Sequence, residues 1–308
     1  MGSVVIAVDV GGTFIKCALV EPDGTVAHTQ RRPTDAGQGP VAVTETIVGT
    51  AAELVGTARE QGHTPVACGV VVPAVIDEAA GVAVFSANLG LRDVPLRDLV
   101  AARTGLPTAL GHDVRAGAVA EARLGAGIGS RRMFFVALGT GIAGALALDG
   151  RVDPGAHGGS GEIGHVMIRT QADARPCGCG GRGCLERYAS ASAVAAAYAE
   201  PGVDAAEVVR RAHAGDGRAS AVWREAVESL ADGLLIGIAL HDPQVAVLGG
   251  GLSQAGQLLL DPLEKELVRR RTFHQLPTLA IARLGDEAGV QGAALLALDA
   301  LQATEGVA

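Results

Sequence analysis

Short apolar runs separated by glycine-rich turns dominate the first part of the chain. Val4–Asp9 has the pattern of a buried strand, turns at Gly11-Gly12, and is followed by a second apolar run, Ile15–Val20. Pro22-Asp23-Gly24 then predicts a hairpin turn into another short strand. After these strands, Pro40–Gln61 has the pattern of a helix. The chain therefore begins with a mixture of strands and helix, as α/β domains do.

Much the same pattern returns about half a chain later. Phe134–Leu138 predicts a strand, Gly139-Thr140-Gly141 a turn, Ala143–Leu148 a second strand and Asp149-Gly150 the next turn. Two such units indicate a duplicated α/β domain with a cleft between the copies, because their separation is too long for a solenoid repeat.

Further strands and helices alternate around these units, which predicts an α/β fold with a mostly central sheet. The expected elements are strands at Ala67–Val72 and Val245–Leu248, helices at Leu96–Thr104 and from near Ser253, a helical region over 190–240 broken around Pro201 and Gly215-Asp216-Gly217, and a last helix around Val290–Gln302. We expect an N-terminal domain over residues 1–115 and a C-terminal domain over residues 116–289. The last helix, within about 290–308, is expected to pack back on the N-terminal domain.

The charge balance argues against nucleic acid as the main partner, because the 308 residues carry a net charge of −8. The only run of three basic residues, Arg269-Arg270-Arg271, is expected on a solvated helix face. The longest uncharged run, Met133–Leu148, is too short to span a membrane. Because no targeting segment is recognised, we expect a soluble, cytoplasmic protein.

Four potential metal ligands stand close together in the sequence. They are His165, Cys177, Cys179 and Cys184. One imidazole and three thiolates can close around a tetrahedral zinc ion, and such a site has no open position, so the metal is expected to be structural. Free thiols are the alternative, while disulfides are disfavoured because five cysteines is an odd number and no secretory signal is evident. Two carboxylates, Glu162 and Glu186, adjoin these ligands and would be drawn together by the metal.

Three glycine-rich turns follow predicted strands and offer backbone N–H groups with no side chain in the way. The first includes Asp9, Gly11, Gly12 and Thr13, the second Gly139, Thr140 and Gly141, and the third Gly249, Gly250 and Gly251. Asp9 ends its strand where an acid can hold Mg²⁺, directly or through water. Most single turns of this kind are only hairpins. Two at corresponding places of a duplicated domain indicate phosphate binding, although neither has a Walker sequence.

With these motifs the chain resembles the ROK family of bacterial sugar kinases, most closely the actinobacterial-type glucokinases, from about Val4 to Ala300. The resemblance implies two actin/hexokinase-like (ribonuclease H-like) domains and transfer of the γ-phosphate of ATP to the primary (6-) hydroxyl of a hexose. It implies that the first turn, through Lys16, and the second turn hold the phosphates, and that the third borders the adenosine. The family's zinc ligands correspond to the four residues above. Its sugar contacts correspond to Asn88, His112, Asp113, Glu162, His165 and Glu186.

Asp113 corresponds to the family's catalytic base, which aligns the acceptor hydroxyl and takes its proton. From the residues alone, Asp113 after Gly111-His112 would more often be a helix N-cap. His165 is expected to bind zinc through one ring nitrogen and a sugar hydroxyl through the other. Glu162 and Glu186 are expected to accept hydrogen bonds from neighbouring hydroxyls.

Several positions depart from the family's usual pattern. They are His112 in place of Asn, Ala74 after Pro73 in place of Gly, Ala143 in place of Gly, Phe14 in place of a frequent Lys, and a stretch from His165 to Cys177 about two residues longer than usual. One interpretation is drift within a glucokinase. The other is an acceptor pocket reshaped for a sugar mimic, such as a carbasugar or cyclitol of the valiolone type that is phosphorylated in secondary metabolism. N-acetylmannosamine is a weaker candidate acceptor.

Two other classes of function follow from the same resemblance. A sugar-sensing repressor would carry a DNA-binding domain before the first turn, and Asp9 follows only eight residues after the start. A non-catalytic sugar sensor is disfavoured by the retention of Asp9, Asp113 and both glycine turns. The resemblance further implies a homodimer, possibly a tetramer.

Overall fold

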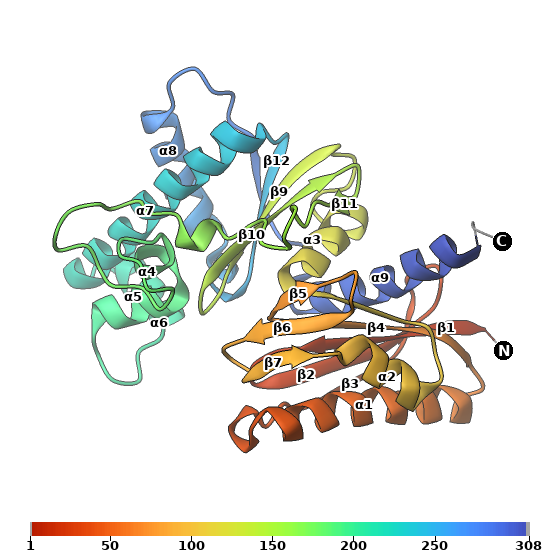
Figure 1. Ribbon diagram of the computed structural model, residues 1–308. Coiled ribbons are helices and arrows are strands. Elements are labelled where there is room, and N and C mark those ends of the chain that lie inside the picture. The colour runs from red at the N-terminus through yellow and green to blue at the C-terminus, as the bar shows by residue number, and fades with distance from the viewer. Residues whose placement is uncertain (1, 306–308) are drawn as a thin grey trace. The chain divides into compact units, whose positions relative to one another are not determined.

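The computed structural model describes residues 2–305, which divide into two compact units (Figure 1). Within the described residues, unit 1 comprises 2–120, 154–159 and 286–305, and unit 2 comprises 121–153 and 160–285. The first boundary falls inside helix α3 (Asp113–Leu124), five residues beyond the expected position, and the short segment Pro154–Gly159 groups with unit 1. Each unit is described separately below.

Unit 1 is built on a five-stranded sheet with the order β3-β2-β1-β4-β8. Its strands are β1 (Ser3–Val10), β2 (Phe14–Val20), β3 (Val26–Pro33), β4 (Thr64–Val72) and β8 (Thr108–His112). The first three pair antiparallel, whereas β4 lies parallel to β1 and β8 parallel to β4. Two antiparallel hairpins thus precede a parallel half.

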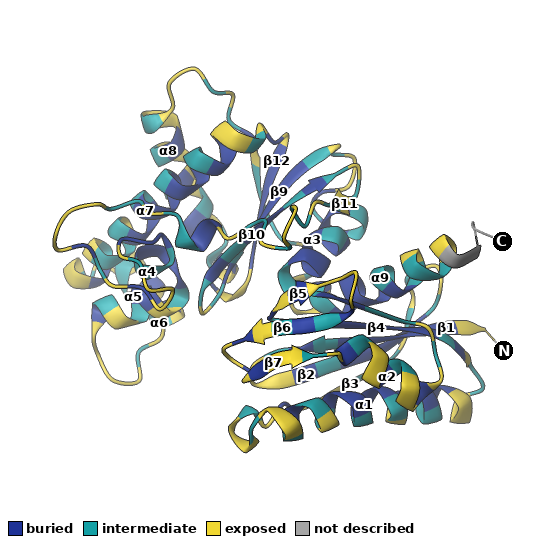
Figure 2. Ribbon diagram, in the orientation of Figure 1, coloured by how far each residue is buried: buried dark blue, intermediate teal, exposed yellow. Residues whose placement is uncertain are grey.

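Helices cover both faces of this sheet, which explains why β1 is an almost uninterrupted apolar run. Alternate residues of β1, such as Val4 and Ile6, pack with α1 (Pro40–Glu60), while Val5 and Ala7 pack with α9 (Ala288–Glu305). Figure 1 shows α1 and α9 on opposite sides of the sheet, and Figure 2 shows β1 and β4 buried between them. The helix α2 (Leu96–Thr104) has the expected bounds, because Gly105 ends it in the left-handed region with φ +71°.

The close approach of α9 depends on a missing side chain in β4. A Cβ atom on Gly69 would lie only 1.9 Å from the carbonyl oxygen of Ala293 in α9. Glycine is therefore required at this position, and the last helix is held directly on the sheet of unit 1.

Helix α1 is the one described helix that is long and apolar enough to cross a membrane by length and composition. Its apolar residues Val43, Ile47 and Leu54 are fully buried in the core of unit 1. This is the pattern of a core helix, which passes the same test.

Unit 1 also contains a three-stranded antiparallel sheet that the sequence analysis did not foresee. It consists of β5 (Val75–Asp77), β6 (Val82–Ser86) and β7 (Leu91–Val94). These strands are short, and their outward residues Val75 and Phe85 are exposed, so the segment lacks the long apolar run by which the other strands are recognised.

Unit 2 repeats the topology of unit 1, with the strand order β11-β10-β9-β12-β13. Its strands are β9 (Arg132–Leu138), β10 (Ile142–Leu148), β11 (Arg151–Val152), β12 (Val245–Gly249) and β13 (Thr278–Ile281). The first three again pair antiparallel and the last two parallel. The duplicated α/β fold is thereby confirmed, strand for strand.

The helices of unit 2 pack against this sheet around Phe134, Val136 and Leu138 of β9. They are α4 (Glu186–Ala189), α5 (Ala191–Tyr198), α6 (Ala205–His213), α7 (Gly217–His241) and α8 (Gln257–Arg270). The side chains of Ser190, Asp204 and Asp216 accept a backbone N–H at the starts of α5, α6 and α7, which fixes where these helices begin. The helix expected near Ser253 starts later, because a 3-10 turn occupies Gly251–Ala255 first.

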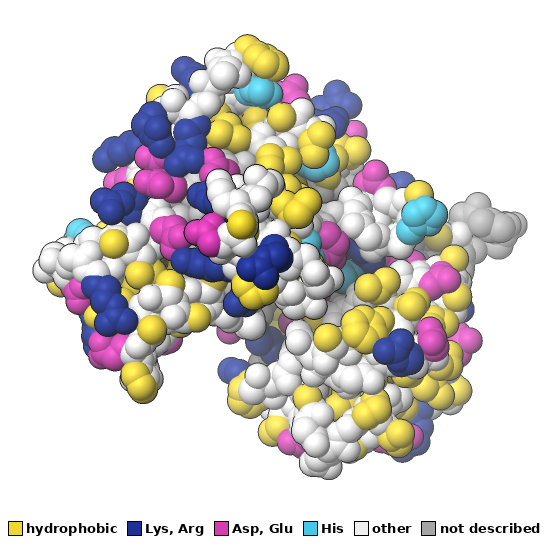
Figure 3. All heavy atoms as spheres, turned by 60° about the vertical axis from the view of Figure 1, so that its left-hand side comes forward, with side chains coloured by type: hydrophobic (Ala, Val, Ile, Leu, Met, Phe, Trp, Pro, Cys, Tyr) yellow, Lys and Arg dark blue, Asp and Glu magenta, His cyan; other side chains and the backbone are white. Residues whose placement is uncertain are grey.

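The basic run at the end of α8 is largely neutralised. Arg269 and Arg270 both pair with Glu266, and Arg270 also bonds Asp232. On the face shown in Figure 3, basic and acidic side chains lie intermixed. On this face the basic side chains therefore do not form one continuous stripe.

Glu121, at the point where α3 enters unit 2, is a fully buried carboxylate. It accepts backbone N–H groups from Ala126 at 2.8 Å, Arg283 at 3.1 Å and Leu284 at 2.7 Å. The chain leaves unit 2 just after Leu284, so Glu121 joins two of the places where the chain passes between units.

Replacing Glu121 with Ala is expected to destabilise the protein by about 3 kcal/mol, because three backbone N–H donors lose their acceptor and a buried side chain is truncated. Urea unfolding measures this difference. Glu264→Ala, on the exposed surface of α8, is the control and is expected to stay within about 0.5 kcal/mol of the original protein. A loss below about 1 kcal/mol for Glu121→Ala would show that the carboxylate is not needed at this junction.

Candidate functional site

The four predicted metal ligands come together in unit 2. One donor atom from each of His165, Cys177, Cys179 and Cys184 lies within 4.8 Å of all the others. Cys177 Sγ is 3.6 Å from His165 Nδ1, and Cys179 Sγ is 3.6 Å from Cys184 Sγ. Sulfur atoms around a tetrahedral zinc with bonds of about 2.3 Å stand about 3.8 Å apart. The donor set and these two separations are compatible with a tetrahedral zinc ion.

Backbone turns hold these ligands in place. The N–H of Cys177 donates to Gly181 O, and the N–H of Gly180 donates back to Cys177 O, with Gly180 at φ +91°. A backbone hydrogen bond involving Gly181 lowers the pKa of the Cys179 thiol, which favours the thiolate that metals bind. All five cysteines are free thiols, and Cys17 and Cys68 are buried in unit 1. The disulfide interpretation is thus excluded by the structure.

The two carboxylates flank the histidine on opposite sides. Glu186 Oε1 lies 3.8 Å from His165 Nδ1 and 3.4 Å from Cys177 Sγ. Glu162 Oε2 lies 3.9 Å from His165 Nε2. The nitrogen Nδ1 thus faces the thiols, and Nε2 faces Glu162 and is left to interact with a ligand. A bound metal on Nδ1 would make Nε2 an N–H donor.

The second and third glycine turns adjoin each other at the ends of β9 and β12. The N–H of Gly139 donates to Gly141 O, and the N–H of Ala191 at the start of α5 donates to Gly139 O. Gly250 has φ +82°, and a Cβ atom there would lie 2.5 Å from Leu138 O. The third turn therefore packs on the end of β9, where the second turn begins.

A pocket of about 440 Å³ opens next to these turns. It is lined mainly by small and apolar residues of the 3-10 turn and of α6, including Gly251, Leu252, Ala255, Ala205 and Val209. A flat, largely apolar ring fits such a lining, with the polar side chains of Gln254 and Arg210 at hand.

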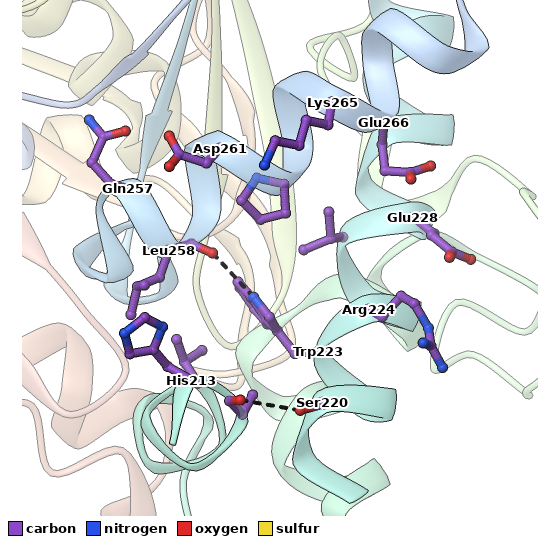
Figure 4. A pocket seen from close by; sticks show the side chains of 14 residues that line it. His213, Ser220, Trp223, Arg224, Glu228, Gln257, Leu258, Asp261, Lys265 and Glu266 are labelled. Atoms are coloured by element: carbon purple, nitrogen blue, oxygen red, sulfur yellow. Dashed lines mark hydrogen bonds between the residues drawn. The ribbon is translucent and has the colours of Figure 1, made fainter. Parts of the chain in front are cut away.

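A second pocket of unit 2, of about 480 Å³, lies among α6, α7 and α8 (Figure 4). Trp223 Nε1 donates to Leu258 O at 3.2 Å. Pro262, four residues after Leu258, has no N–H, so the indole supplies the donor that the helix lacks there. The hydrogen bond between Trp223 and Leu258 is thus explained by the structure of α8. Because no predicted site residue lines this pocket, we assign the pocket no role in the site.

In unit 1, Asp9 is the penultimate residue of β1 and Asp113 follows β8, so both aspartates stand at the carboxyl edge of the parallel strands. Asp9 is only partly exposed, and desolvation raises its pKa to about 7, with the negative charge of Asp113 contributing in the same direction. A Cβ atom on Gly289 would lie 2.3 Å from Asp9 Oδ2. The start of α9 therefore lies against this carboxylate.

Asp113 is the first residue of α3, and its Oδ1 accepts the N–H of Val114 at 2.8 Å. His112 Nδ1 lies 3.1 Å from the same N–H and 3.2 Å from Asp113 Oδ1. Asp113 thus accepts a backbone N–H at the start of α3, as the helix-start interpretation expects. Asp113 Oδ2 has no hydrogen-bond partner among residues 2–305, which leaves it available to a ligand.

The remaining predicted residues of unit 1 lie around the first turn. The N–H of Gly11 donates to Phe14 O, and Thr34 Oγ1 donates to Gly11 O at 2.6 Å. A Cβ atom on Gly12 would lie 4.0 Å from Asn88 Cβ, so Asn88 is next to this turn. Lys16 instead points to the segment before α9, where its Nζ donates to Asp286 O at 3.1 Å.

Gly289 was missed by the sequence analysis, although the chain holds a usable signal. Gly289 and Gly292 stand three residues apart in α9, and a Cβ atom on Gly292 would lie 2.2 Å from Ala116 O in α3. Residues three apart lie on the same face of a helix, so the two missing side chains leave room on one face of α9. They bring α9 to α3 and to Asp9.

Comparisons with known proteins agree with this arrangement. The model of the ROK family matches residues 5–300. A glucokinase of Streptomyces coelicolor is 33% identical, with 95% of this chain and 96% of the relative aligned. The ROK hexokinase of Thermus thermophilus has a TM-score of 0.81 at 34% identity, over 98% of this chain and all of the other. A ROK glucokinase of Streptomyces griseus, solved in complex with glucose and AMPPNP, has a TM-score of 0.80 at 32% identity, over 96% of this chain and all of the other.

Proposed function

Because the chain belongs to the ROK family and is a sugar kinase, a phosphotransferase that acts on an alcohol group, we propose that it phosphorylates the 6-hydroxyl of a hexose, with ATP as donor and glucose as the first candidate acceptor. The observation that carries this proposal is the placement of Glu162 and Glu186 on either side of His165 beside the metal ligands. Two acceptors and one N–H donor held by a rigid cluster suit the neighbouring hydroxyls of a sugar ring.

The nucleotide half of the proposal rests on unit 2. The second glycine turn would bind phosphate through its backbone N–H groups. The pocket of about 440 Å³ beside the third turn would hold the adenine ring against its apolar lining. The relative solved with glucose and AMPPNP supports this pair of ligands.

The transfer itself is proposed to use the two aspartates of unit 1. Asp113 would take the proton of the acceptor hydroxyl through Oδ2 as the bond to phosphorus forms. Asp9 would hold Mg²⁺, directly or through water, and the first glycine turn would bind phosphate. The metal ion would neutralise charge on the phosphates.

The cyclitol alternative loses one of its supports in the structure. Ala74, which departs from the family's glycine, is only 5% exposed and packs in the core of unit 1. The burial of this residue argues against a methyl group that protrudes into an open acceptor pocket. His112 remains a departure from the family pattern, so the alternative is an outcome of the test below.

A coupled kinase assay with purified protein and Mg-ATP tests the proposal. The acceptors are glucose, mannose, N-acetylmannosamine and a valiolone-type cyclitol, and NMR identifies the phosphorylated position. We expect the highest kcat/KM for glucose, with phosphate on the 6-hydroxyl. A higher value for the cyclitol would replace the proposed acceptor, and sugar binding without turnover would make the protein a sensor. In the same preparation, light scattering measures whether the protein is the homodimer that the family resemblance implies.

Metal removal is expected to weaken acceptor binding as well as stability. Without zinc, the imidazole of His165 loses its bond to the metal, so its position next to Glu186 depends on the backbone turns alone. We expect about one zinc per chain in the purified protein, a lower Tm after chelation, and a KM for glucose raised tenfold or more. Added zinc should restore both values. A verified zinc-free sample with unchanged Tm and KM would show that the cluster does not organise the site.

A further inference from the structure

Glu186 lies between the metal ligands and the second glycine turn, all within unit 2. Its Oε1 is on the side of Cys177 Sγ and His165 Nδ1, at 3.4 and 3.8 Å. Its other oxygen, Oε2, is directed at Gly141: a Cβ atom built on Gly141 would lie 2.8 Å from it. The carboxylate of Glu186 thus lies against both the metal ligands and the second glycine turn.

The backbone does not explain why residue 141 is glycine. Gly141 is absent from the residues with positive φ, so a left-handed conformation is not the reason for glycine here. Among the described residues, apart from its two chain neighbours, the atoms within 4 Å of its hypothetical Cβ belong to the Glu186 carboxylate. Gly139, at the other end of the same turn, has open space around its Cβ position and no positive φ. The two glycines of this turn therefore differ in what a methyl group would meet.

We propose that Gly141 is a specificity-determining position for the sugar: the space left by its missing side chain sets where the Glu186 carboxylate stands, and through it the affinity for the acceptor. The inference rests on the proposed function, in which Glu186 accepts hydrogen bonds from the acceptor. It assigns to Gly141 a task separate from phosphate binding by the turn. The metal ligands restrict the position of the Glu186 carboxylate on one side. The backbone at Gly141 restricts it on the other.

The test compares Gly141→Ala with Gly139→Ala, using the zinc-loaded protein, glucose and Mg-ATP. Because the clash in Gly141→Ala is with the far end of a flexible side chain, the fold should persist and the carboxylate should shift. We expect the Kd for glucose alone, measured by calorimetry, and the KM for glucose to rise about tenfold or more, since a hydrogen bond to a charged group is lost. Gly139→Ala is expected to change the KM for ATP and to leave the Kd for glucose within twofold.

A second variant separates displacement of Glu186 from general damage. In Gly141→Ala combined with Glu186→Asp, the shorter side chain makes room for the methyl group. We expect Glu186→Asp alone to weaken glucose binding, and the added Gly141→Ala to weaken it by less than threefold more, which is non-additivity of coupled residues. Full additivity, or a Gly141→Ala variant that changes only the KM for ATP, would overturn the inference. If the unchanged protein phosphorylates no hexose, the proposed function fails first, and the two failures are distinguished.

Discussion

Asp113→Asn is expected to lower kcat by about 10³-fold or more while the protein still binds glucose and keeps its fold. Asparagine retains an oxygen that can accept the N–H of Val114 at 2.8 Å, so the start of α3 should survive. What it loses is the basicity needed to take a proton from the acceptor hydroxyl. The assay is kcat with Mg-ATP and glucose, together with Tm and the Kd for glucose without nucleotide.

Two further variants separate the loss of the base from effects on stability. Asp113→Ala removes the Val114 contact as well and is expected to cost about 1 kcal/mol of stability in addition to the loss in turnover. Asp98→Asn, at an exposed position in the first turn of α2, is expected to leave kcat and Tm unchanged. If Asp113→Asn kept a tenth of the original kcat, Asp113 would be a helix-start residue and not the base.

The elements that could be predicted from the sequence are those whose signals are local. Strand β1 is apolar on both faces because α1 and α9 cover it, and this leaves a continuous run in the sequence. Helix α2 ends at Gly105 because glycine takes the left-handed conformation there. The metal ligands were found by their spacing, since short loops bring them together regardless of the rest of the fold.

The features that were missed depend on pairings distant in sequence. Glu121 is buried because Arg283 and Leu284 supply N–H groups, more than 160 residues further along the chain. The segment Pro154–Gly159 groups with unit 1, where Arg115 Nη1 donates to Gly158 O at 2.9 Å. Neither pairing leaves a periodic or compositional trace near the residues concerned. Side-chain charge alone would place Glu121 and Arg115 at the surface.

Asp9, next to the first glycine turn, is expected to make the stability of the protein depend on pH. Its carboxylate is desolvated at the start of α9, with the negative charges of Asp113 and Asp286 adding to the effect and Lys16 opposing it. Its pKa rises from 3.8 to about 7 in the folded protein. Between these values the folded state holds a proton that the unfolded state has released, so raising the pH lowers stability, and above about pH 7 the full cost is present.

Asp9→Asn is therefore expected to stabilise the protein and to abolish most of its activity. The amide carries no charge to desolvate, so the gain in unfolding free energy over the original protein should be small near pH 4, grow up to pH 7 and level off at pH 8. The pKa change corresponds to at most about 4 kcal/mol at pH 8. Activity should fall about 10²-fold or more, because the proposed Mg²⁺ ligand is lost. Urea unfolding from pH 4 to 8 without Mg²⁺ measures the first effect, and the coupled assay the second.

The control for this prediction is an aspartate whose pKa is shifted in the opposite direction. Asp23 lies on the exposed hairpin before β3, and the N–H of Thr25, at 2.8 Å, lowers its pKa, so Asp23→Asn should not stabilise the protein at any pH. Mg-ATP should raise the Tm of the original protein more than that of Asp9→Asn, because only the carboxylate would gain a cation. A gain in stability that did not change with pH would mean that desolvation of Asp9 is not its cause. A carboxylate that costs stability without its ligand and is needed for turnover is what a metal-binding position requires, since the cation would offset the charge that the fold leaves unpaired.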